Sequence, residues 1–223
     1  MSRTLSTAIA ALALGICASS ASASDLGGLK DGTRSDTDYT PHAAAFVGLG
    51  VGLEVGGQFT NIAISDGPFS FDGIGADGLV GGATLEYLFP MGRFRVGPYA
   101  EGGFSNVNTR IELGPIDGDL ATQDYYFGGG LKIGYMIAPV TMIYGRGGYE
   151  WSQWSSDFIS DKANVGSGKL GVGIESMATD HLSVGLGLDY SRPLSVDIGG
   201  DDYQSLLEDT ESFRGVLRFT YRQ

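Results

Sequence analysis

The residues of this chain with the clearest chemical potential are acidic and basic side chains that recur on one face of segments with a two-residue period. The carboxylates on that face are Glu54, Glu86, Glu101, Glu150, Glu175 and Asp189. The cations on it are Arg95, Lys132, Arg146, Lys169, Arg214, Arg218 and Arg222. Two carboxylates with separate acid and base roles can cleave a glycosidic bond. Each carboxylate here has a cation available as a partner, and an unpaired buried charge is costly, so the pattern favours ion pairing over catalysis.

Other kinds of reactive site are poorly represented. The chain has two histidines, His42 and His181, and one cysteine, Cys17. Its glycine-rich stretches are not followed by the helical pattern that a phosphate-binding loop requires, and its acidic segments lack the ligand spacing of a calcium-binding loop. The formal net charge of -12 disfavours nucleic acid as a partner, because phosphates require basic patches. We therefore predict a non-enzymatic protein without a cofactor, a metal site or a nucleic-acid partner.

The elements that must position the charges are plainest in the hairpin from Tyr125 to Trp151. Leu131 and Ile133 lie on one face of its first arm, whereas Lys132 lies among glycines on the other. Alternation of this kind identifies β-strands, because successive side chains point to opposite faces of a sheet. An apolar face opposite a face of glycine and single charges is expected where one side meets lipid and the other curves around a narrow interior.

Aromatic residues stand near the ends of the predicted strands, on the apolar face. Transmembrane barrels carry girdles of such residues at both membrane interfaces. The predicted girdle consists of Tyr87, Phe89, Tyr125, Phe127, Tyr135, Tyr149, Trp151, Tyr190, Phe219 and Tyr221. The sequence therefore predicts an all-β fold, an eight-stranded antiparallel up-and-down transmembrane β-barrel. A soluble lipocalin-like barrel is the alternative, but it would place the larger apolar face inside.

Short turns and long polar segments alternate between the predicted strands. The turns lie near Met91, Pro139 and Asp180, and the polar segments run for roughly 12 to 20 residues, as in barrels with short periplasmic turns and long outer loops. Pro98 cannot donate to a strand ladder, so we expect a bulge or a missing hydrogen bond there. The predicted strands are 43–55, 79–89, 94–101, 125–137, 143–152, 169–175, 182–190 and 213–221.

The N-terminal segment differs from the rest of the chain. Residues 1–23 combine Arg3, an apolar stretch and a run of small residues at 21–23, which predicts a secretory signal peptide. Cys17 lies within it, so the mature chain is predicted to have no thiol chemistry. Residues 24–40 are polar and show no period, which predicts a flexible periplasmic tail. The barrel is predicted to occupy residues 41–223.

These features together resemble the small eight-stranded outer-membrane barrels of Gram-negative bacteria, the OmpA, OmpX and opacity-protein group. The start of the predicted mature chain at residues 25–32, DLGGLKDG, and the strand pieces at 149–151 and 173–175 are similar to the alphaproteobacterial surface-antigen branch. The resemblance implies a location in the bacterial outer membrane, contact with lipid and lipopolysaccharide, and insertion by the barrel-assembly machinery.

The C-terminus follows the pattern of this group in part. The assembly machinery recognises apolar residues at alternate positions before a terminal aromatic residue. Leu217, Phe219 and Tyr221 keep that alternation, but the chain ends in Gln223. The resemblance therefore implies assembly by this route with a weakened signal.

Two functions fit the predicted architecture. In the first, the paired charges plug the lumen, and the protein has a structural or surface-exposed role of the adhesion or antigen type, with acidic outer loops that meet a surface partner. In the second, the protein is a narrow porin for ions or small solutes, and its path is lined by Arg146, Arg214, Arg218 and Glu101. An outer-membrane enzyme would need serine, histidine and carboxylate grouped on the outer rim, whereas both histidines are predicted at the opposite rim.

Overall fold

The computed structural model describes residues 45–66, 69–113, 116–155, 162–198, 201–202 and 210–223. The predicted signal peptide at 1–23, the predicted tail at 24–40 and His42 lie outside these residues. The described strands are β1 (Gly48–Asp66), β2 (Phe69–Met91), β3 (Phe94–Ser105), β4 (Asn108–Leu113), β5 (Ile116–Ala138), β6 (Thr141–Ser155), β7 (Ala163–Met177), β8 (Leu182–Ile198), β9 (Asp201–Asp202) and β10 (Glu211–Arg222).

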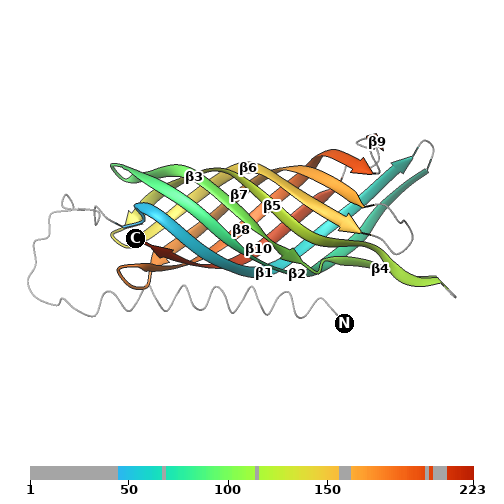
Figure 1. Cartoon of the computed structure of the whole chain (residues 1–223), viewed down its shortest axis with the longest axis horizontal. Coiled ribbons are helices and arrows are strands. Elements are labelled where there is room, and N and C mark those ends of the chain that lie inside the picture. Colours follow the sequence, from blue (N-terminus) through green and yellow to red (C-terminus); the bar gives the residue numbers. More distant parts are fainter. Residues whose placement is uncertain (1–44, 67–68, 114–115, 156–161, 199–200, 203–209) are drawn as a thin grey trace, which may run out of the picture. The chain divides into compact units, whose positions relative to one another are not determined.

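The strands form one closed antiparallel sheet (Figure 1). Consecutive strands pair around the barrel, and β1 closes it by pairing with β2 on one side and β10 on the other, so that Glu54 stands opposite both Gly82 and Arg218. Strands β3 and β4 both pair with β5 and together make one wall, whereas the two-residue β9 pairs only with β8. The wall therefore has eight strands, and the predicted fold is confirmed.

The strands are longer than the sequence pattern predicts. The polar segment predicted between the first two strands continues as strand, and β1 and β2 are separated only by residues 67–68. The prediction of a long loop there was wrong because a polar residue need not leave the sheet: Gln58 and Thr60 are buried inside the barrel, while Phe59 between them is exposed. The period of two thus continues with polar side chains on the inner face.

The start of the first strand also differs from the prediction. Strand β1 begins at Gly48 rather than at residue 43, and Ala45, predicted to face outward, is 7% exposed. Phe46 next to it has a positive φ of 59°, a conformation that strand residues do not adopt. The chain therefore turns inward just before it enters the sheet.

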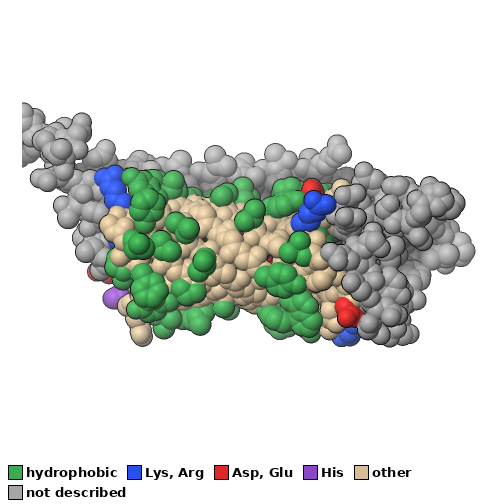
Figure 2. All heavy atoms as spheres, turned by 90° about the horizontal axis from the view of Figure 1, so that it is seen from above, with side chains coloured by type: hydrophobic (Ala, Val, Ile, Leu, Met, Phe, Trp, Pro, Cys, Tyr) green, Lys and Arg blue, Asp and Glu red, His purple; other side chains and the backbone are tan. Residues whose placement is uncertain are grey.

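The apolar face of the wall points outward. Leu53, Leu170 and Leu188 are 66–67% exposed, whereas the inward-facing Lys132 is 1% exposed. On the face that Figure 2 shows, hydrophobic side chains form patches along the described barrel, and lysine and arginine lie toward its two ends. This arrangement is the inverse of a water-soluble barrel. None of the described residues forms a helix long and apolar enough to cross a membrane.

The ladder between β2 and β3 is interrupted beside Pro98. Pairing runs as far as Glu86 with Tyr99 and resumes at Phe89 with Val96, in the same register on both sides. The two intervening positions of this hairpin, Tyr87 opposite Pro98 and Leu88 opposite Gly97, are not paired. The predicted loss of a hydrogen bond at Pro98 is confirmed, and because the register does not shift there, no bulge accompanies it.

The same interruption makes Gly97 sensitive to substitution. A Cβ atom at Gly97 would overlap the Tyr87 carbonyl oxygen and lie 3.1 Å from Leu88 Cα. We expect Gly97→Ala to lower the free energy of unfolding by about 2 kcal/mol through overpacking, as measured by urea unfolding in lipid vesicles. Gly145→Ala is the control, since a Cβ there meets nothing nearer than a carbonyl oxygen at 4.0 Å. Equal losses in the two variants would contradict the steric argument.

Candidate functional site

The structure places all the predicted lumen charges inside the barrel. Each of these residues is at most 6% exposed. They come from all around the wall because every strand places alternate residues on the inner face. The set is Glu54, Glu86, Arg95, Glu101, Lys132, Arg146, Glu150, Lys169, Glu175, Asp189, Arg214, Arg218 and Arg222.

Four of these residues form a cluster near the end of the barrel with the short turns, which we call the mouth cluster: Glu86, Lys132, Glu175 and Arg222. Lys132 Nζ lies 2.9 Å from Glu86 and 2.8 Å from Glu175. Arg222 Nη2 bridges the same two carboxylates, at 2.7 Å from Glu175 and at close range from Glu86. Ser183 Oγ also donates to Glu175 at 2.5 Å. Two cations therefore neutralise two carboxylates across β2, β5, β7 and β10.

A second group, the central cluster, consists of three carboxylates and three cations. Arg146 pairs with Glu101 at 2.8 Å and forks onto both oxygens of Asp189, with its Nε at 2.8 Å. Lys169 lies between Glu101, Glu150 at 3.0 Å and Asp189 at 3.5 Å. The residues of the cluster are Glu101, Arg146, Glu150, Lys169, Asp189 and Arg214. Their charges cancel, so the cluster is a neutral plug rather than a row of one sign.

Arg214 links the central cluster to the outer half of the lumen. Its Nη1 and Nη2 atoms each lie 2.9 Å from an oxygen of Glu150, and its Nε donates to Gln58 at 2.9 Å. Gln58 in turn donates to Gln123 at 2.9 Å. The bidentate guanidinium–carboxylate pair is the strongest of these geometries, because it fixes both partners in one plane.

Inward-facing tyrosines complete the polar filling, and the sequence analysis did not assign them. The hydroxyl of Tyr126 donates to Glu54 at 3.0 Å, and Arg218 donates to the hydroxyl of Tyr144 at 3.0 Å while pairing with Glu54 at 2.9 Å. Lys132 lies 4.4 Å from the centroid of the Tyr144 ring. The signal was available: both tyrosines occupy the glycine-and-charge face of their strands, where an aromatic residue can only be lumenal.

An apolar group lies on the inner side of the barrel as well. Its buried members are Ala76, Val80, Val107, Tyr126 and Val216, with Trp154 packed against them. Val107 points into the interior where the strand is interrupted between β3 and β4. Two hydrogen bonds between Asn106 and Leu79 hold this interruption in place. Sequence reasoning missed Val107 because the predicted strand stopped at residue 101, whereas the inward alternation of Arg95 and Glu101 continues as far as Val107. The lumen is therefore filled by apolar as well as charged side chains.

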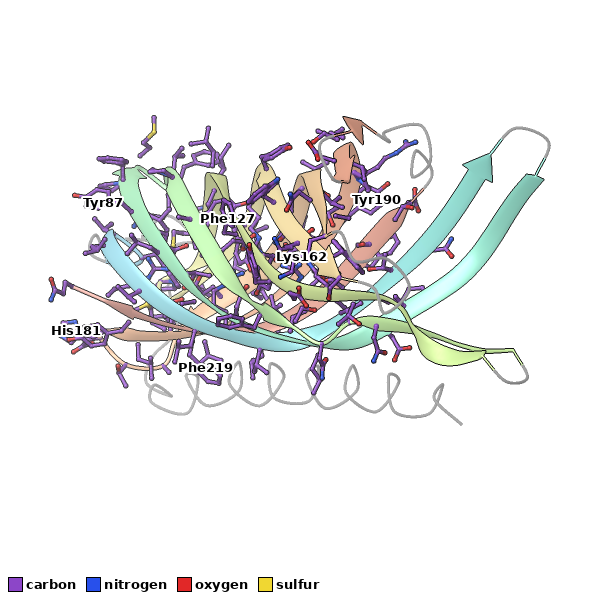
Figure 3. All side chains as sticks on the ribbon, turned by 45° about the vertical axis from the view of Figure 1, so that its right-hand side comes forward. Tyr87, Phe127, Lys162, His181, Tyr190 and Phe219 are labelled. Carbon is purple, nitrogen blue, oxygen red and sulfur yellow. The ribbon has the colours of Figure 1, made fainter. Side chains whose placement is uncertain are left out.

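The predicted girdle residues all lie on the outer face, where each is exposed or half-buried. Ring pairs form between Tyr87 and Phe89, with centroids 4.8 Å apart, and between Phe127 and Trp151, at 5.0 Å. Figure 3 shows Tyr87 and Phe219 near the end with the short turns and Tyr190 toward the other end. Further rings not predicted as girdle, those of Phe94 and Phe213, pair with Tyr135 and Tyr190.

The structure also places the glycine-rich stretches and His181. The spacing G-x-G-x-x-G does occur, at residues 73–78 and 166–171, but both stretches lie within strands, β2 and β7, instead of at a strand-to-helix turn. His181 is exposed in the turn before β8, where its Nδ1 lies 3.2 Å from the Arg222 carbonyl oxygen (Figure 3). Neither arrangement forms a catalytic group with the charges of the lumen.

A closed antiparallel barrel with a lipid-compatible outer face and a charged inner face defines a small transmembrane β-barrel protein. The sequence agrees, because residues 8–208 match the model of the outer membrane protein beta-barrel domain. The chain belongs to this family, and its location is the bacterial outer membrane, in contact with lipid and lipopolysaccharide. No curated protein sequence is detectably similar to it, and the alphaproteobacterial surface-antigen branch stays a prediction.

Solved structures similar to this chain include small outer-membrane proteins at low sequence identity. Ail, the attachment invasion locus protein of Yersinia pestis, is 15% identical, with 78% of this chain and 99% of that chain covered and a TM-score of 0.43. Neisserial surface protein A is 10% identical, with 77% and 97% covered and a TM-score of 0.48. OprG from Pseudomonas aeruginosa is 15% identical, with 80% and 97% covered and a TM-score of 0.43.

The central cluster yields a stability prediction. Glu101→Ala removes the carboxylate shared by Arg146 and Lys169 and leaves buried cations with fewer partners, so we expect a loss of about 3–5 kcal/mol in the free energy of unfolding. The matched control is Asp124→Ala, which removes a half-buried carboxylate that lies 3.9 Å from the exposed Lys162 and accepts a hydrogen bond from Ser155 at 3.0 Å, and which should cost about 1 kcal/mol. Urea unfolding in lipid vesicles measures both. A Glu101→Ala variant as stable as Asp124→Ala would show that the cluster is not a tightly coupled plug.

Proposed function

We propose that this protein is a closed outer-membrane barrel with a structural or surface-exposed role of the adhesion or antigen type. The observation that carries the proposal is the filled lumen. Each of its six carboxylates, Glu54, Glu86, Glu101, Glu150, Glu175 and Asp189, has at least one cation within 3.5 Å. A path for ions needs sites that bind weakly enough to release them, whereas these charges already neutralise one another.

A closed lumen directs the function to the outer ends of the strands. Strands β1, β2 and β5 are 19, 23 and 23 residues long, whereas a membrane-spanning strand needs about 9–11 residues. The surplus length carries the chain beyond the lipid, at the end opposite the short turns (Figure 1). We propose that this outer part meets a surface partner and that the protein is not an enzyme.

The charge of the outer part limits the kind of partner. Asp197 of β8 stands opposite Asp202 of β9 in the ladder. The sequence between β9 and β10 adds Glu208 and Asp209, and β10 begins with Glu211. Ail is known in complex with the heparin analogue sucrose octasulfate, but a polyanion of that kind is repelled by acidic loops. For this chain we propose a neutral or basic partner surface.

The second candidate is a narrow porin, and the density of charge along the lumen favours it. Arg146, Arg214, Arg218 and Glu101 would line the path and set the ion preference. This candidate requires the clusters to separate and re-form, because in the described residues their side chains fill the interior.

Single-channel conductance in a planar bilayer decides between the two candidates. We expect the wild-type barrel to insert without stable current steps, because its lumen is closed. The Arg146→Ala variant should show brief current events, since it opens the central cluster. Lys162→Ala is the control, because that side chain is 59% exposed and lies outside the lumen. Stable, ion-selective wild-type steps that Arg146→Ala alters would overturn the plug and establish the porin.

The C-terminal residue gives a test of the assembly route. We propose that the barrel-assembly machinery recognises β10, whose outward residues Leu217, Phe219 and Tyr221 alternate before Gln223. Gln223→Phe extends this alternation with a further aromatic residue and should speed assembly in vesicles that contain the machinery, with no change in plain vesicles. The rate at which a heat-resistant folded band appears on a gel measures this. An equal gain in both kinds of vesicle would point to a general effect on folding and count against recognition.

A further inference from the structure

The chain enters the barrel through a short inward turn at residues 45–47, just before β1. Ala45 and Phe46 are 7% and 0% exposed. Phe46 has φ 59° and Gly48 has φ 89°, so Val47 is flanked by two residues in the left-handed region. At Gly48 a side chain is excluded, because a Cβ atom would also lie 2.9 Å from the Gln223 carbonyl oxygen.

Contacts with two lumen arginines hold this turn in place. Arg95 Nε donates to the Ala45 carbonyl at 2.8 Å, and its Nη1 donates to the Gly92 carbonyl at 2.9 Å in the turn between β2 and β3. Arg222 of the mouth cluster lies with its guanidinium carbon 5.4 Å from the centroid of the Phe46 ring. The ring therefore packs against the mouth cluster through Arg222, at the end of the barrel with the short turns.

The turn can move without breaking the sheet. The first ladder pairs of β1 are Gly48 with Leu88 and Gly50 with Arg222, so residues 45–47 take no part in the ladder. A bulky residue at positive φ is strained and persists only when its surroundings hold it. Here the surroundings are the buried ring and the hydrogen bond from Arg95, both of which are lost together when the turn swings outward.

We propose that residues 45–47 form a stopper, with Phe46 as its plug, which closes the periplasmic mouth of the lumen and opens it when displaced. The stopper is independent of any surface role, because it acts at the opposite end of the barrel. Its removal exposes the mouth cluster to the periplasm while the central cluster stays closed. On this proposal the lumen has two separate barriers, one an apolar ring on a displaceable turn and the other a set of ion pairs.

Cysteine labelling tests the stopper in the full chain carrying Cys17→Ser. Thr220→Cys places a thiol on the lumen wall two residues deeper than Arg222, at a position 1% exposed whose hydroxyl has no hydrogen-bond partner among the described residues. Phe46→Ala should speed its reaction with sulfonatoethyl methanethiosulfonate on the order of a hundredfold, because loss of a buried ring lowers the cost of local opening. Phe46→Gly, which removes the ring and accepts the positive φ, should do the same.

A second thiol separates mouth opening from general loosening. Ser167→Cys reports on the outer half of the lumen, where Ser167 is 7% exposed, and its labelling rate should stay within about twofold in the Phe46 variants. Phe59→Ala, at an outward-facing ring that is 53% exposed, should change neither rate. Unchanged labelling at Thr220→Cys in both Phe46 variants would overturn the stopper, as would an equal rise at both thiols.

Discussion

The pairing of charges inside a narrow barrel is the constraint on which the rest of this structure depends. A charged side chain inside a narrow lumen loses most of its hydration, so each buried carboxylate needs a cation at hydrogen-bonding distance. The pairs cross the barrel: Lys132 of β5 joins Glu86 of β2 to Glu175 of β7, and Arg214 of β10 holds Glu150 of β6. These ion pairs need not contribute more free energy of folding than apolar side chains in their place would. They do fix which strands face one another.

The glycine-rich inner face follows from the same constraint. Long arginine and tyrosine side chains can lie across the lumen only where the facing wall is small. Gly171 illustrates this, since a Cβ atom there would collide with the Asp189 carboxylate and lie 3.0 Å from Arg146 Cγ. The glycines of this face therefore provide room for the ion pairs.

A filled lumen shapes how the protein can act. Its outer face is committed to lipid, and its interior is occupied by paired charges and an apolar group, which leaves the strand extensions beyond the membrane as the part available to other molecules. At the opposite end, Phe46 packs against Arg222 of the mouth cluster. The proposed functions therefore assign different tasks to the two ends of the barrel.

The sequence by itself determined the strand faces, the strand count and the set of charges inside the barrel, because the period of two assigns every side chain to one face once lipid is placed on the apolar side. It also located the weak ladder at Pro98, since a missing N–H group is a local property. Only the tertiary structure decided which charges pair, because Arg146 and its partners Glu101 and Asp189 are far apart in the chain. The same holds for Phe46 and Val107, which lie just outside strands and are buried by tertiary contacts.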